Sequence, residues 1–307
     1  MKTIIITILL SMTMAMVAHA DSVQVDVAFT KTRKYLDDNK VNVTGGPGGA
    51  RDDLAAFGQE AIMFYGQAAG NPKHTGSQRG LLAQRAAVLD AQRAMAEYLE
   101  GFVIVGVTLV KDSMLQDDVI LSTVSALVKG SQVVVQEYSK EADTAIAVVK
   151  LGLHGPKGFA STFYEKMGSD PKLKETVKSD KKPFIVPEAE VKHDVAYDGL
   201  IIDATEQSFR PALINRIFAT KGDILYDPAK ISQKVLVEQG CGEYTNSIDK
   251  AKAALSTRGV KNPLVIKASG ATSAADLQVT DDDAVIIYSA NQKGSFMAAA
   301  KVAFVLK

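Results

Sequence analysis

The sequence predicts an α+β protein made of two small α+β domains, the first a sheet covered on one face by helices. Residues 60–153 show the order strand, helix, strand, helix, strand, strand, which is typical of helices packed on a sheet. Residues 197–306 again mix short apolar runs with helical patterns. The expected divisions are a signal peptide at 1–20, an N-terminal segment with a Gly-rich linker at 21–58, a first domain at 59–155, a Lys- and Pro-rich linker at 156–194 and a second domain at 195–307.

The first twenty residues have the pattern of a cleavable secretory signal peptide. Lys2 supplies a positive charge, residues 4–17 form an uncharged, mainly apolar run, and Ala18-His19-Ala20 places small residues at the two positions that a signal peptidase reads. We expect cleavage after Ala20 and a periplasmic mature chain. An uncleaved N-terminal anchor is the alternative, although a bilayer span needs roughly 20 apolar residues.

The mature chain contains a single cysteine, Cys241. Because Asp21 rather than cysteine follows Ala20, a lipid anchor at this signal is excluded. One thiol cannot form an internal disulfide, so the fold must depend on an ordinary apolar core. Cys241 has no histidine near it in sequence, and we expect a buried thiol without a catalytic role. No later segment has the pattern of a transmembrane helix.

The N-terminal segment contains the glycine-rich stretch 44–49. This stretch lacks the Gly-Lys-Ser/Thr ending with which phosphate-binding loops contact phosphate and metal, so it is interpreted as a linker.

The elements of the first domain follow from periodicity and from glycine stops. A strand or the end of a short helix is expected at 60–69, helices at 77–100 and 116–128, and strands at 102–110, 131–138 and 144–153, the last two joined by a hairpin at 139–143. Gly101 is expected to end the long helix. The apolar positions of that helix that lie near helical spacing are Leu81, Leu82, Ala86, Leu89, Ala96 and Leu99, with Arg93 among them.

The second domain is expected to start with a strand at 197–204. Further strands are predicted at 212–219, 224–226, 263–268, 277–279 and 297–306, with helices at 247–255 and 281–290. The first two of these further strands form a hairpin about 220–223. The run Asp281-Asp282-Asp283 lacks the ligand spacing of a calcium loop, so we expect Thr280 or Asp281 to cap the helix that begins there.

The residue types that commonly catalyse reactions or bind metals do not form a known motif in this sequence. His74, His154 and His193 lie far apart, and no pair has the close spacing of a zinc site. No serine lies in a nucleophile elbow, although two carboxylates brought together by the fold stay open as a hydrolase hypothesis. We therefore predict no enzyme, and no catalytic, cofactor-binding or metal-binding residue.

The charge pattern indicates no nucleic-acid partner. The chain has 35 basic and 35 acidic residues, without a long basic run. The densest basic stretch, 172–182, is interpreted as a solvated linker surface, with a docking patch as the alternative. Arg79, Arg85 and Arg93 share part of one helix surface, where they can bind an anion or, as expected, form ion pairs with Asp90 and Glu97.

The long helix also carries a family resemblance. Residues 76–101, GSQRGLLAQRAAVLDAQRAMAEYLEG, resemble the signature helix of the LPP-twenty lipoprotein family, and the similarity extends over about 60–153. The resemblance implies an envelope protein related to those that assemble around the flagellar motor or lie on the outer membrane. It implies no catalytic residues. This chain lacks the lipid-bearing cysteine of the lipoprotein members.

Three functional hypotheses follow from the sequence. The first is a non-enzymatic periplasmic structural or assembly protein that binds itself or other envelope proteins. The second is a periplasmic module that binds a small ligand or peptidoglycan. The third is a hydrolase of a new type.

Overall fold

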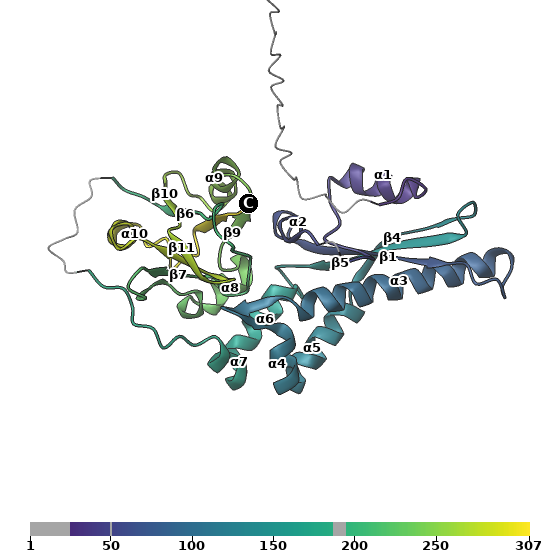
Figure 1. Ribbon diagram of the computed structural model, residues 1–307, viewed down its shortest axis with the longest axis horizontal. Helices are drawn as coiled ribbons and strands as arrows, with labels where there is room; N and C mark the ends of the chain where they lie inside the picture. Colours follow the sequence, from purple (N-terminus) through teal and green to yellow (C-terminus); the bar gives the residue numbers. More distant parts are fainter. Residues whose placement is uncertain (1–24, 50, 187–194) are drawn as a thin grey trace, which may run out of the picture.

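The computed structural model describes residues 25–49, 51–186 and 195–307 (Figure 1). It shows a mixed α+β fold in two parts, as the sequence predicts. We call residues 25–186 the N-terminal part and residues 195–307 the C-terminal part. The predicted signal peptide and His193 lie outside the described residues.

The N-terminal part is built on an antiparallel sheet of order β1-β5-β4. Its strands are β1 (Ala61–Ala69), β4 (Gln132–Ser139) and β5 (Thr144–Gly152). The segment 60–69 is thus a strand rather than a helix end, and it pairs with β5 from Ala61 opposite Gly152 to Ala69 opposite Thr144. The hairpin expected at 139–143 joins β4 to β5.

Helices cover this sheet on both faces. The helices α3 (Gly76–Glu100) and α5 (Asp118–Lys129) belong to one side, as predicted, and α1 (Thr30–Asn39) packs on the other. Successive strand residues point to opposite faces. Ile62 and Phe64 accordingly belong to the core beneath α3, while Ala61 and Met63 pack with residues of α1. This double coverage explains why β1 is apolar at nearly every position rather than at alternate ones.

The buried face of α3 differs from the predicted one. Leu81 and Leu89 are 57% and 64% exposed. The residues that α3 buries are Gly80, Ala83, Ala87, Ala91, Met95, Tyr98 and Leu99. The reason is the sheet opposite, where Gly66, Ala68, Ala145 and Ala147 leave room for a close backbone approach and no room for leucine.

The strand predicted at 102–110 is also corrected. The chain forms β2 (Val103–Val105), turns at Gly106, pairs back as β3 (Thr108–Leu109) and enters α4 (Val110–Gln116). Gly106 has a φ of 59°, a left-handed conformation that glycine adopts without strain. Asp117 then caps α5, because its side chain accepts a hydrogen bond from the Val119 N–H at 2.8 Å.

The segment 156–194, expected as a linker, contains two helices, α6 (Phe159–Ser169) and α7 (Pro171–Thr176). Phe159, Phe163 and Tyr164 of α6 are buried in the main core. This half of the segment therefore packs as part of the body of the protein, together with α2 (Asp53–Gly58).

The C-terminal part contains two four-stranded sheets. One is parallel, with the order β10-β6-β13-β9, and the other is mixed, with the order β11-β12-β7-β8. The strands are β6 (Gly199–Asp203), β7 (Arg216–Ala219), β8 (Ile224–Tyr226), β9 (Glu243–Thr245), β10 (Pro263–Lys267), β11 (Gly270–Ser273), β12 (Asp276–Val279) and β13 (Val302–Val305). The helical elements are η2 (Pro228–Lys230), α8 (Gln233–Gln239), α9 (Ile248–Thr257) and α10 (Asp281–Gly294).

Most predicted elements of the C-terminal part are present, and several of the strands are shorter than predicted. The hairpin about 220–223 joins β7 to β8, and the strand expected at 297–306 is confined to Val302–Val305. Thr280 caps α10, since its hydroxyl accepts a hydrogen bond from the Asp283 N–H at 3.1 Å. The helix cap predicted for this acidic run is therefore confirmed.

One apolar core extends through both parts. The carbonyls of Val103 and Ile104 accept hydrogen bonds from the Leu213 and Ile214 N–H groups, at 3.0 and 2.8 Å. The rings of Phe57 and Tyr244 lie 4.5 Å apart. None of the helices in the described part of the chain combines the length and apolar character that a bilayer span needs.

Candidate functional site

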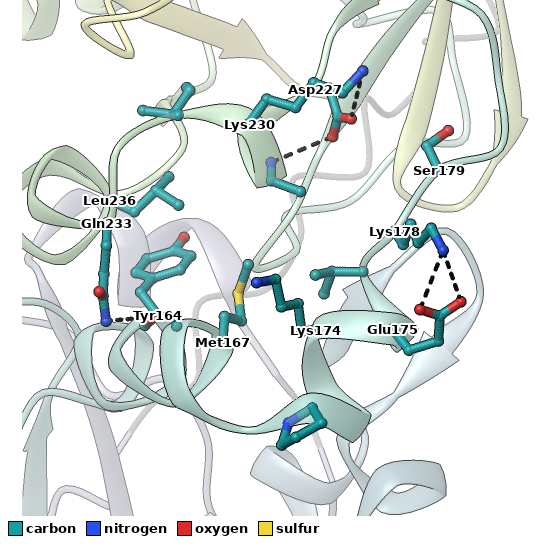
Figure 2. A pocket seen from close by; sticks show the side chains of 15 residues that line it. Tyr164, Met167, Lys174, Glu175, Lys178, Ser179, Asp227, Lys230, Gln233 and Leu236 are labelled. Carbon is teal, nitrogen blue, oxygen red and sulfur yellow. Dashed lines mark hydrogen bonds and ion pairs between the residues drawn. The ribbon is translucent and has the colours of Figure 1, made fainter.

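A groove of about 560 Å³ lies between α6–α7 on one side and η2–α8 on the other (Figure 2). Such a volume falls within the roughly 300–1,000 Å³ of small-molecule sites. Its floor is apolar. Met167, Val177 and Leu236 are buried there, and Ile231 is half-buried.

Local capping positions the α6–α7 wall of the groove. Asp170 ends α6, and its carboxylate accepts hydrogen bonds from the N–H groups of Lys172 and Leu173 at 2.9 and 3.1 Å. The Leu173 N–H in particular lowers the pKa of Asp170. Pro171 then occupies the first turn of α7, where its missing N–H is not needed. The chain therefore turns sharply between α6 and α7.

Polar contacts hold the two walls together. The Gln233 side-chain amide donates a hydrogen bond to the Glu165 carbonyl at 3.0 Å, and the Ser161 hydroxyl donates to the Val237 carbonyl at 2.8 Å. A side chain at Gly168 would lie 2.8 Å from the Gln233 amide carbon, so glycine makes room for this contact. The groove is consequently a fixed feature rather than a loose gap.

The rim is basic. Lys178 pairs with Glu175 at 3.3 Å, and Lys230 pairs with Asp227 at 3.7 Å. Asp227 is already paired with Arg216 at 3.2 Å, and both of these side chains are buried. Lys174 forms no ion pair with any other described residue. Among the residues that line the groove, three lysines therefore stand against two carboxylates.

The structure does not bring the histidines together. His154 pairs through Nδ1 with Glu60 Oε2 at 2.5 Å, and its side chain is only 13% exposed. His74 is half-buried in a separate loop. Among the residues that the structure describes, no three His, Cys, Asp or Glu side chains are arranged to hold a metal ion.

Cys241 belongs to a buried polar cluster that joins distant segments. Its sulfur lies 3.1 Å from the Tyr244 hydroxyl, which also contacts Asn215 Oδ1 at 2.5 Å. The hydroxyls of Tyr164 and Tyr226 donate to backbone carbonyls at 2.8 and 2.6 Å. Burial raises the pKa of the Cys241 thiol and holds the pKa values of the three tyrosines well above their usual range.

The arginines of α3 form different ion pairs. Arg93 lies 3.9 Å from Asp90, as expected, whereas Arg79 pairs with Asp143 in the β4–β5 hairpin. Arg85 is exposed between Leu81 and Leu89 along the helix. The outer surface of α3 therefore presents leucines and arginines together.

The comparisons concern the C-terminal part. Residues 199–307 match the family model of the second domain of Treponema pallidum Tp0624. This Tp0624-like region covers about a third of the chain and begins at the first residue of β6. It includes the η2–α8 wall of the groove, while the α6–α7 wall precedes it. The search of curated proteins found no match.

The sequence did not reveal the groove. Its walls come from 164–179 and 227–236, which no motif connects. One signal was present, because Lys174 and Lys178, which both line the groove, lie only four positions apart in the sequence. These two lysines belong to the basic stretch 172–182 that was interpreted as a solvated surface.

Proposed function

We propose that this protein is a non-enzymatic, exported envelope protein that assembles with itself or with other envelope proteins through the outer surface of α3. One observation carries the proposal. Along residues 80–91 the long helix buries Gly80, Ala83, Ala87 and Ala91, whereas Leu81 and Leu89 are 57% and 64% exposed. Packing against the small residues of the sheet accounts for the buried glycine and alanines, but it does not account for two leucines on the outer surface.

The neighbouring helices add exposed apolar side chains. Leu115 at the end of α4 is 79% exposed, and Val119 and Leu121 of α5 are 44% and 43% exposed. Fully burying one leucine or valine contributes about 1.5–3 kcal/mol. Covering some of these partly exposed side chains in an interface would therefore favour association.

The sequence supports an envelope location. A secretory signal peptide at 1–20 directs export to the periplasm, and the helix resembles that of the LPP-twenty lipoprotein family. In this proposal the chain is a non-lipidated member, associated with the flagellar motor or the outer membrane. Because no cysteine follows Ala20, attachment to a membrane structure depends on protein contacts.

The test is the mass of the chain from Asp21 to Lys307 by size-exclusion chromatography with light scattering, followed by crosslinking in the envelope. We expect association that the double variant Leu81→Gln/Leu89→Gln abolishes. Both side chains are exposed, so the melting temperature should change little. The matched control is Val107→Gln, which replaces an apolar side chain that is 74% exposed in the turn between β2 and β3, outside α3, and should leave association intact.

Two results would argue against assembly through α3. One is a strictly monomeric native chain for which crosslinking recovers no envelope partner. The other is association that persists unchanged in the double leucine variant.

The alternative function, a module that binds a small ligand or peptidoglycan, is favoured by the groove between α6–α7 and η2–α8. A rise in melting temperature with an added ligand would support it.

A further inference from the structure

We infer that the groove between α6–α7 and η2–α8 binds a small anionic amphiphile, with the apolar tail on the groove floor and a carboxylate on Lys174. This inference names the ligand class for the alternative function. It involves none of the α3 residues on which assembly depends.

The floor accounts for the apolar part of the ligand. Met167, Val177 and Leu236 are 8%, 3% and 3% exposed, yet each contributes to the groove surface. Ile231 and Pro171 extend this surface toward the solvent. An acyl chain laid across these side chains would lose contact with water without displacing any protein hydrogen bond, because the lining at this level is hydrocarbon and thioether.

Lys174 accounts for the charged part of the ligand. Figure 2 shows its side chain extending across the groove toward Met167, in contrast to Lys178, which turns to Glu175. Lys174 is thus a cation beside an apolar floor, without a carboxylate partner among the described residues. A bound carboxylate would complete the ion pair that the protein itself does not supply.

The surrounding charges favour an anion over a cation. Three lysines line the groove, against the carboxylates of Glu175 and Asp227. Asp227 is already neutralised by the buried Arg216, whose guanidinium also donates a hydrogen bond to the Val177 carbonyl. The local potential is therefore positive, which attracts anionic ligands and repels cationic ones.

The experiment uses 8-anilinonaphthalene-1-sulfonate, an anionic apolar dye, on the chain from Asp21 to Lys307. The protein has no tryptophan, so dye fluorescence is measured against a low background. Decanoate should displace the dye. Neutral 1-decanol and cationic decyltrimethylammonium, which carry the same tail, should compete at least about tenfold more weakly, a difference of about 1.4 kcal/mol.

Charge-matched variants locate the site. Lys174→Glu should weaken decanoate binding by at least about tenfold. Lys234→Glu makes the same charge change on α8 outside the groove lining and should bind decanoate as the native chain does. Ile231→Asp, which places a carboxylate on the floor, should also weaken binding. Melting temperatures of all three variants establish that each is folded.

Three outcomes would overturn the inference. They are the absence of saturable dye binding, equal competition by decanoate and decanol, and native decanoate affinity in folded Lys174→Glu. The double variant Leu81→Gln/Leu89→Gln should keep full decanoate binding. The proposal of ligand binding in the groove and the proposal of assembly through α3 are therefore tested independently.

Discussion

Gly66 in β1 marks the closest approach between the sheet and α3. A side chain there would overlap the Ala91 nitrogen and the Ala87 oxygen, and its Cβ would lie 2.8 Å from the Asp90 carbonyl carbon. All three are main-chain atoms of a helix, so no side-chain rotation relieves the overlap. Gly66→Ala is therefore expected to push α3 away from the sheet.

The cost follows from the packing that this shift would loosen. The nearest of these contacts would be to the Ala91 nitrogen, and restoring ordinary contact there requires the helix to withdraw by roughly an ångström, a gap over which close-packed interiors lose much of their dispersion energy. Ala83, Ala87, Ala91 and Met95 all pack along this line. Overpacking usually costs about 1–3 kcal/mol, and two rigid backbones place this case near 3 kcal/mol. The melting temperature should fall by roughly 5–10 °C.

Urea unfolding followed by far-UV circular dichroism measures this change. The matched control is Gly58→Ala at the end of α2, where an added Cβ meets nothing within 4 Å. Its stability should stay within about 0.5 kcal/mol of the native value, or rise slightly. A Gly66→Ala variant whose unfolding midpoint equals that of the native chain would show that the helix does not need this approach.

Two further predictions concern buried groups. Because burial covers Cys241 and raises the pKa of its thiol, the folded protein should react slowly with a disulfide reagent such as dithionitrobenzoate and rapidly in urea; fast reaction of one thiol per folded chain would contradict this. Burial also raises the pKa of Asp276, whose Oδ1 has no hydrogen-bond partner among the described residues, so the folded state binds its proton more tightly than the unfolded state. Ionised Asp276 then opposes folding at neutral pH, an effect that disappears as the pH falls through the folded pKa. Asp276→Asn should accordingly raise the free energy of unfolding by about 1 kcal/mol near pH 7 and by less near pH 4, and a loss of stability at neutral pH would refute the reasoning.

The sequence predicts those elements that local rules define. The long helix, the hairpin at 139–143 and the Thr280 cap all depend on periodicity, turn residues and capping within a few positions. The prediction of one strand over 102–110 is wrong because the chain turns at Gly106, which adopts a left-handed conformation. The β-branched residues on both sides of Gly106 favour a strand and do not indicate this turn.

The buried face of α3 could not be predicted from the helix alone. Leucines and alanines both recur at helical spacing, and the sheet decides which row faces inward. The small residues Gly66, Ala145 and Ala147 become opposite neighbours of α3 only after β1 and β5 have paired. The groove could not be predicted for the same reason. Lys174 and Leu236 both line it because tertiary packing brings their segments together, and no sequence motif connects them.

The contacts between the two parts also determine which surfaces stay uncovered while the chain is being made. Synthesis proceeds from the N-terminus, so Phe57 and β2 exist before any of their partners in the C-terminal part. The hydrogen-bond donors for β2 arrive with Leu213 and Ile214, and the ring that covers Phe57 arrives with Tyr244. A nascent chain that stops before Leu213 therefore carries an uncovered aromatic surface and a strand lacking these partners. This surface is covered only when the chain has been made as far as β9.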